Sequence, residues 1–275
     1  MHDRHRPICI RLTALALATG VVMGRGGDAL AAETVQLLVE PLLNARSVTT
    51  LTGGVLVPWT MGIDGGGTAD GYMTAAASKF HNDPPNLKAL PDDGKFPADA
   101  RHPEVVLHFS NAADAASQQT HPVKGAGEFS FTTPAAQFDK LFLFFTSSEG
   151  GSALKVTLTY ADATTDLVSQ TVPDYFNAIA ANDPVFFNLA SDLPKWNKQN
   201  NVAEANHHYI HGMEIHPAPA KVLSRVTVQK SANGYLGGVA AAATQLPRDN
   251  SEREHSVLHD FPRVGGLLDF GKPAK

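Results

Sequence analysis

Four histidines and one glutamate fall within ten residues of the sequence: His207, His208, His211, Glu214 and His216. If this segment is a strand, residues two apart share a face, so His208, Glu214 and His216 lie along one side of it. Neutral imidazole and carboxylate groups are ligands of zinc and other transition metals. The three residues therefore form a candidate transition-metal site, although hydrogen-bonded strand histidines without a metal are the more common arrangement.

A second group of potential ligands lies in a glycine-rich segment, residues 64–71, which reads DGGGTADG. The carboxylates of Asp64 and Asp70, together with backbone oxygens, are hard ligands of the kind that calcium takes. The segment lacks the ligand spacing of an EF-hand loop, and no Gly-Lys-Ser/Thr follows it as in a phosphate-binding loop. It is a candidate calcium loop, with a plain flexible turn as the alternative.

Two aromatic residues beside predicted loops are candidates for binding a sugar. A flat ring can stack on the apolar face of a sugar while amide groups bind its hydroxyls. Trp196 has Asn197 and Asn200 close by in the sequence, and Tyr72 follows the glycine-rich segment. These four residues form the candidate ligand-binding set, with structural packing of the rings as the alternative.

Motifs for nucleophilic catalysis are not apparent. The sequence has no G-x-S-x-G, and its only cysteine is Cys9. Asp and Glu residues are numerous enough to supply the paired carboxylates of a glycoside hydrolase, but nothing in the sequence singles out one pair. The sequence therefore favours a non-catalytic protein and leaves a hydrolase as an alternative.

The elements that must position these residues are strands, most clearly in residues 138–175. Val156, Leu158 and Tyr160 alternate with polar residues, which is the period of a strand with one buried face. Residues 141–145, LFLFF, are apolar on both faces, as in a strand inside a packed sandwich. Further strands are expected in residues 35–57, 105–109, 129–131, 208–216, 222–228 and 236–243, with long irregular regions at 62–102 and after 175, and single helical turns at 75–80 and 176–181.

Several short motifs in these strands resemble the galactose-binding-like jelly-roll domain of carbohydrate-binding modules and secreted glycoside hydrolases. They are LKVTLTYADATTDLVSQTVPDY (residues 154–175), IHP (215–217), KVLSRVTVQ (221–229) and GGVAAAAT (237–244). The resemblance covers roughly residues 62–244 and implies a single antiparallel β-sandwich with long loops, often with a structural calcium. One departure is Ala163, where such hairpins carry Gly; because alanine takes a positive φ poorly, the sequence predicts a longer turn there.

The first 31 residues are typical of an export signal. Arg4, Arg6 and Arg11 precede an apolar run that is too short to span a bilayer, and Ala29-Leu30-Ala31 offers a cleavage site. Removing residues 1–31 takes away four of the 22 basic and two of the 27 acidic residues, which leaves 18 basic and 25 acidic residues and no cysteine. An exported, disulfide-free and acidic protein fits a bacterial periplasmic, cell-surface or extracellular location. It fits neither nucleic acid binding nor membrane insertion after cleavage.

The sequence thus predicts three regions: a signal peptide (1–31), a β-sandwich domain (33–244) and a C-terminal tail of low order (245–275). The expected function is binding of carbohydrate or another cell-surface polymer, through the loops of residues 62–102 and 183–211. One alternative is a metal-dependent or carboxylate-based secreted hydrolase. A second alternative is an assembly protein that docks a partner through its tail.

Overall fold

Residues 138–175 form three consecutive strands, as predicted, but these strands belong to two different sheets. They are β9 (Phe138–Ser148), β10 (Ser152–Tyr160) and β11 (Thr165–Val172). β9 lies inside a nine-stranded sheet, whereas β10 and β11 form a hairpin in a four-stranded sheet. The short turn after β9, with Glu149 at φ 58° and Gly150 at φ 97°, therefore carries the chain from one sheet to the other.

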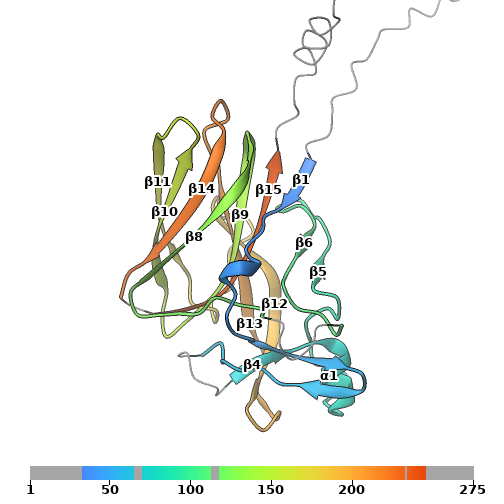
Figure 1. The fold of residues 1–275 in the computed structure, drawn as a ribbon. Coiled ribbons are helices and arrows are strands. Elements are labelled where there is room, and N and C mark those ends of the chain that lie inside the picture. Colours follow the sequence, from blue (N-terminus) through green and yellow to red (C-terminus); the bar gives the residue numbers. More distant parts are fainter. Residues whose placement is uncertain (1–32, 65–69, 113–117, 233, 246–275) are drawn as a thin grey trace, which may run out of the picture. The chain divides into compact units, whose positions relative to one another are not determined.

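The computed structural model describes residues 33–64, 70–112, 118–232 and 234–245, which belong to one compact unit (Figure 1). The nine-stranded sheet has the order β1-β15-β9-β13-β12-β4-β2-β3, with β7 beside β15. Its other strands are β1 (Glu33–Gln36), β2 (Val48–Thr52), β3 (Val55–Val57), β4 (Asp70–Met73), β7 (Val123–Lys124), β12 (Phe186–Asn197), β13 (Val202–Ile215) and β15 (Tyr235–Gln245).

The four-stranded sheet has the order β11-β10-β14-β8, with β8 (Gly127–Ala136) and β14 (Leu223–Lys230) as its remaining strands. A separate pair is formed by β5 (Lys95–Phe96) and β6 (Val105–Val106). The all-β prediction is confirmed. The sheets are not purely antiparallel, however, because β2 and β4 pair in parallel.

The main apolar core lies between the four-stranded sheet and the β9, β13 and β15 part of the larger sheet (Figure 1). From β10 it takes Val156, Leu158 and Tyr160, and from β9 it takes Leu141 and Leu143. The alternation in β10 thus reflects one face packed on the core, while Lys155, Thr157 and Thr159 point outward. This sandwich-like packing leaves β8, β10, β11 and β14 with an outer face that is mostly polar, with Leu167 as an exposed apolar residue.

The irregular regions predicted from the sequence hold more regular structure than expected. Residues 75–80 do form a helix, α1 (Ala75–Phe80), in which Thr74 caps the N-terminus by accepting a hydrogen bond from Ala77 N (3.3 Å). One 3₁₀ turn, η1 (Glu40–Leu42), precedes β2. The helical turn predicted at 176–181 is wrong, because these residues form turn and irregular backbone. The loop predicted at 183–211 is also wrong for most of its length, because β12 and β13 occupy it.

The turn between β10 and β11 accommodates Ala163 in the left-handed conformation, with φ 64°. Ala163 N donates to Tyr160 O (3.0 Å), and Tyr160 N donates to Thr164 O (2.9 Å), so three residues form the loop. Asp162 Oδ1 accepts from the backbone and the hydroxyl of Thr164. The turn is one residue longer than the tightest hairpin, and alanine occupies the position that favours glycine.

The predicted signal peptide (1–31) and all but the first residue of the predicted tail (245–275) lie outside the described residues. Within the described ranges, every helix is too short or too polar to cross a bilayer.

Candidate functional site

Three of the residues singled out in the sequence for chemistry, Asp64, Asp70 and His208, meet around the side chain of Lys195. Its Nζ lies 3.0 Å from Asp64 Oδ2, 3.3 Å from Asp70 Oδ2 and 3.3 Å from Glu204 Oε1. The ammonium also donates to the Tyr175 hydroxyl (3.2 Å) and lies 5.7 Å from the centre of that ring. We call Lys195, Asp64, Asp70, Glu204, Tyr175 and His208 the Lys195 cluster.

A bulge in the β12–β13 pairing builds this cluster. Between the pairs Leu193↔His208 and Lys195↔Glu204, β12 advances two residues while β13 advances four. Asn206, inside the extra stretch, takes φ 51°. Glu204 and His208 are thereby brought together, with His208 Nε2 3.2 Å from Glu204 Oε2. The clustering depends on this irregularity, because residues four apart in a regular strand lie about 13 Å apart.

The cluster holds Lys195 in its charged form. Burial alone lowers the pKa of an ammonium, but the hydrogen bonds to Asp64 and Tyr175 outweigh it and raise the pKa of Lys195 well above its usual range. Burial also raises the pKa of the Tyr175 hydroxyl, which therefore stays protonated at neutral pH. With carboxylate oxygens of Asp64, Asp70 and Glu204 at 3.0, 3.3 and 3.3 Å, Lys195 acts as the shared ion-pair partner of the cluster.

His208 is fully buried beside Lys195. Its Nδ1 donates to Leu193 O (3.0 Å), and its ring stacks on Tyr175 with centroids 4.7 Å apart. Burial is the main influence on the pKa of His208 and lowers it, while the carboxylate of Glu204 acts in the opposite direction. In the neutral ring the proton lies on Nδ1, so Nε2 faces the Glu204 carboxylate without a hydrogen bond.

The two aspartates of the candidate calcium loop are close together, but they bind an ammonium group. Asp64 and Asp70 both direct Oδ2 at Lys195 Nζ, which takes the place of a cation between them. Gly71 lies in β4, where a Cβ would come within 2.5 Å of the Trp59 ring, so this glycine serves packing. Residues 65–69 of the loop lie outside the described residues, so calcium binding by the whole loop stays a prediction.

The predicted transition-metal set is divided between two places. Glu214 lies 3.0 Å from His216 and 2.8 Å from the Lys140 ammonium. His208 belongs to the Lys195 cluster, six residues away along β13 and so about 20 Å distant. Among the residues that the structure describes, no three His, Cys, Asp or Glu side chains are arranged to hold a metal ion.

The predicted sugar-binding set consists of structural residues. Trp196 is 1% exposed, packs against Trp59 and Met73, and donates from Nε1 to Asp83 Oδ2 (2.9 Å). Tyr72 is 2% exposed. Neither ring offers a free face, so the prediction of an aromatic platform at Trp196 and Tyr72 is corrected here.

The two asparagines of that set shape the turn between β12 and β13. Asn197 Oδ1 accepts from Gln199 N and Asn201 N, each at 3.0 Å, and Asn200 takes φ 62°. Asparagine tolerates this left-handed conformation better than most residues. The formation of this turn is enough to explain the asparagines at 197, 200 and 201, so they do not require a bound sugar.

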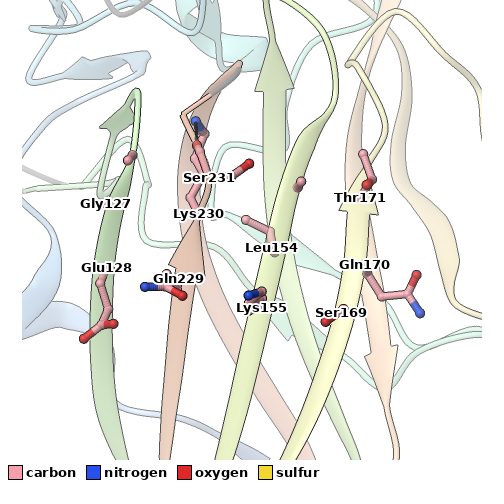
Figure 2. Close-up of a pocket in the computed structure, with 12 residues that line it drawn as sticks. Gly127, Glu128, Leu154, Lys155, Ser169, Gln170, Thr171, Gln229, Lys230 and Ser231 are labelled. Carbon is pink, nitrogen blue, oxygen red and sulfur yellow. Dashed lines mark hydrogen bonds between the residues drawn. The ribbon is translucent and has the colours of Figure 1, made fainter.

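An open hollow lies elsewhere, on the outer face of the four-stranded sheet (Figure 2). Its volume is about 960 Å³, and no aromatic residue is among the described residues that line it. Apart from Ala126 and Ala153, the exposed side chains that line the hollow are polar: Glu128, Lys155, Ser169, Thr171, Gln229 and Ser231. Hydroxyl, amide, ammonium and carboxylate groups therefore line one wide depression over all four strands.

The strand register aligns four of these side chains into one row across the sheet, which we call the polar row. Lys155 pairs with Ser169 on one side and with Gln229 on the other, and Gln229 pairs with Glu128. Paired residues of antiparallel strands point to the same face, so the four side chains stand side by side (Figure 2). Beyond the hollow, the same face continues with Thr157 and Thr227 and with Leu167, an exposed apolar residue that pairs with Thr157.

A buried lysine closes one end of the hollow. Lys230 is 1% exposed and donates from Nζ to Gly125 O (2.8 Å) and Gly234 O (2.7 Å). These contacts tie the loop before β8 and the loop after β14 to the end of the sheet. Hydrogen bonds from the Lys230 ammonium to backbone carbonyls therefore hold the rim of the hollow in place.

The sequence analysis missed the hollow because its residues are ordinary exposed strand positions. The signal was present in part, since the alternation in β10 places Lys155, Thr157 and Thr159 on one outward face. Their alignment with Gln229 and Glu128 depends on the pairing of β10 with β14 and of β14 with β8. The first pairing joins segments about 75 residues apart and the second joins segments about 100 residues apart, which local periodicity does not reveal.

Comparison with known proteins suggests no family and no function for this chain. The sequence matches no protein-family model, and no curated protein is similar to it.

Proposed function

We propose that this chain is an exported, non-catalytic protein that binds carbohydrate or another cell-surface polymer through the hollow on its four-stranded sheet. The supporting observation is the hollow itself, which is open and carries hydroxyl, amide and charged side chains on the face of a hydrogen-bonded sheet. The proposal includes a jelly-roll arrangement related to the galactose-binding-like domains, in line with the motifs of residues 154–175 and 221–229. It moves the binding site from the loops to the face of a sheet.

The chemistry of the hollow suits a hydroxyl-rich ligand. Sugar hydroxyls both donate and accept hydrogen bonds, and the hollow offers hydroxyls at Ser169 and Thr171 and an amide at Gln229. Ring stacking makes no contribution from the lining residues, so binding depends on hydrogen bonds that compete with water. We expect weak binding at each site, which a repeating polymer strengthens through multivalency.

Sedimentation with insoluble polysaccharides tests the proposal. The purified chain is mixed with cellulose, chitin, xylan or bacterial cell-wall peptidoglycan, and the free protein is measured after centrifugation. The double variant Ser169→Ala/Gln229→Ala removes two hydrogen-bonding groups of the polar row, each worth about 1 kcal/mol, so we expect about a ten-fold to thirty-fold loss of affinity.

Lys198→Ala is the matched control, because Lys198 is exposed on the turn after β12, away from the hollow. It should bind as the unmodified chain does. If the unmodified chain sediments with no polymer, the proposed function is wrong. If the double variant folds and binds like the unmodified chain, the hollow is not the site.

A further inference from the structure

The polar row carries two opposite charges that do not neutralise each other. Lys155, on β10, and Glu128, on β8, are both exposed, and neither forms an ion pair within the described part of the chain. Gln229, on β14, stands between them in the same register. Ammonium, amide and carboxylate groups therefore follow one another across the floor of the hollow (Figure 2).

The geometry of the sheet sets the spacing of these groups. Neighbouring strands lie about 4.8 Å apart, so the backbones at Lys155 and Glu128, with one strand between them, are about 10 Å apart. The intervening Gln229 side chain keeps the two charges from direct contact. A bound molecule can reach both charges only if it carries complementary groups at a similar separation.

The overall charge of the protein argues against a polyanion, and the mixed signs within the polar row favour a ligand that carries both signs. The chain has a formal net charge of −5, which disfavours a polyanion, and Glu128 adds local repulsion. Lys155 in turn repels a polycation. A neutral glycan can offer hydroxyl hydrogen bonds to both groups, but it adds no ion-pair attraction to offset their partial desolvation.

We propose that the hollow recognises a polymer whose repeating unit carries both a carboxylate and an ammonium group, of the kind found on a peptide-bearing cell-wall glycan. The ligand carboxylate lies over Lys155, a backbone amide bonds Gln229, and the ligand ammonium lies over Glu128. This inference rests on the proposed function and names the ligand class for the same site.

Three polymers separate the possibilities in one sedimentation experiment. Intact peptidoglycan carries free amines and carboxylates, acetylated peptidoglycan has its amines blocked, and chitin has a related glycan backbone without peptides. We expect tighter binding to intact peptidoglycan than to either control by about five-fold, the size that exposed ion pairs support. The difference should disappear in 0.5 M NaCl, where the Debye length is about 4 Å.

Charge reversal gives a sharper test. Lys155→Glu and Glu128→Lys should each weaken binding to intact peptidoglycan about five-fold or more. The double variant Lys155→Glu/Glu128→Lys should regain most of the affinity, because the reversed row accepts the repeating polymer in the opposite direction. Lys198→Glu is the control for a change in net charge.

The outcomes distinguish the two claims. If no polymer of any class binds, the proposed function fails together with this inference. If chitin, acetylated and intact peptidoglycan bind equally, or if the double reversal binds no better than the single ones, this inference alone is overturned.

Discussion

The Lys195 cluster and the outer face of the four-stranded sheet both carry charged side chains, but they use them in opposite ways. In the cluster, three carboxylates are directed at one ammonium within 3.0–3.3 Å, and the Lys195 side chain is only 6% exposed. In the polar row, Lys155 and Glu128 point to solvent with Gln229 between them. In the first region the charged groups pair with one another inside the protein, whereas in the second region they are exposed and unpaired within the described residues.

The difference shows where binding can occur. A charged group that already has a close partner has little to gain from a ligand, and removing one partner of a buried pair is costly. Exposed groups on a rigid sheet keep only water as a partner, and a ligand can replace that water. The Asp, Glu, His and Lys side chains of the Lys195 cluster thus already have partners within the protein, whereas the separated charges of the polar row remain accessible to the ligand that we propose.

The largest effect should follow from replacing Lys195. In Lys195→Met, the carboxylates of Asp64, Asp70 and Glu204 lose their shared cation. We expect the free energy of unfolding to fall by about 3 kcal/mol, at the lower end for a broken buried pair because Glu204 and Asp64 keep access to water. Urea unfolding followed by circular dichroism measures this change.

Lys198→Met is the matched control, since the same substitution on the exposed turn should alter stability by less than about 0.5 kcal/mol. Equal losses in the two variants would show that the loss does not come from breaking the ion pairs of Lys195. Polymer binding by the folded Lys195→Met protein should be unchanged, because Lys195 does not line the hollow.

A smaller effect should appear when a metal cation is offered to the same variant. Without the Lys195 ammonium, Asp64 and Asp70 are available to a hard cation. Calcium at ten times its dissociation constant should restore about 1.4 kcal/mol to Lys195→Met. The unmodified chain should show no comparable gain in thermal unfolding. A gain of equal size in both proteins would show that calcium binds beside Lys195, contrary to the arrangement described above.

The free energy of unfolding of the protein should depend on pH through His211, which lies in β13 and contacts the loop at Asn177. Burial lowers the pKa of His211, while its Nε2 donates to Asn177 O (3.0 Å). The unfolded chain then binds more protons than the folded one, so the free energy of unfolding should fall as the pH drops below about 6.5. In His211→Gln this part of the decline should be absent between pH 7.5 and 5.5. An unchanged slope in urea unfolding would assign the decline to other groups.

The sequence predicts the scaffold of this protein better than its surface. Strong alternation in residues 154–160 and the apolar run at 141–145 predict strands correctly, because both patterns reflect burial that is local to each strand. β12 was missed because Asp192 and Pro194 break its pattern, and the structure accommodates them with bulges in its pairing with β13. Bulges depend on the partner strand, which a single segment does not specify.

The candidate residues illustrate the same limit. Asp64, Asp70 and His208 do meet, but only because Lys195 lies between them, and its role depends on contacts 125 to 131 residues away in the sequence. The sequence analysis had no reason to select Lys195. Trp196 stands in a polar segment, yet Asp83, 113 residues earlier, accepts its indole hydrogen bond and draws the ring inward.

The smallest effect should come from the turn at the end of the four-stranded sheet, outside both regions. Ala163 holds φ 64°, a conformation that costs an alanine about 1–2 kcal/mol and that glycine adopts freely. Part of this gain is lost because glycine makes the unfolded chain more flexible, so Ala163→Gly should stabilise the protein by about 0.5–1 kcal/mol. Ala161→Gly, at a turn position without positive φ, should instead destabilise it slightly. Because the turn carries no residue of the hollow, a change in polymer affinity in Ala163→Gly would show that the sheet face is less rigid than the binding proposal requires.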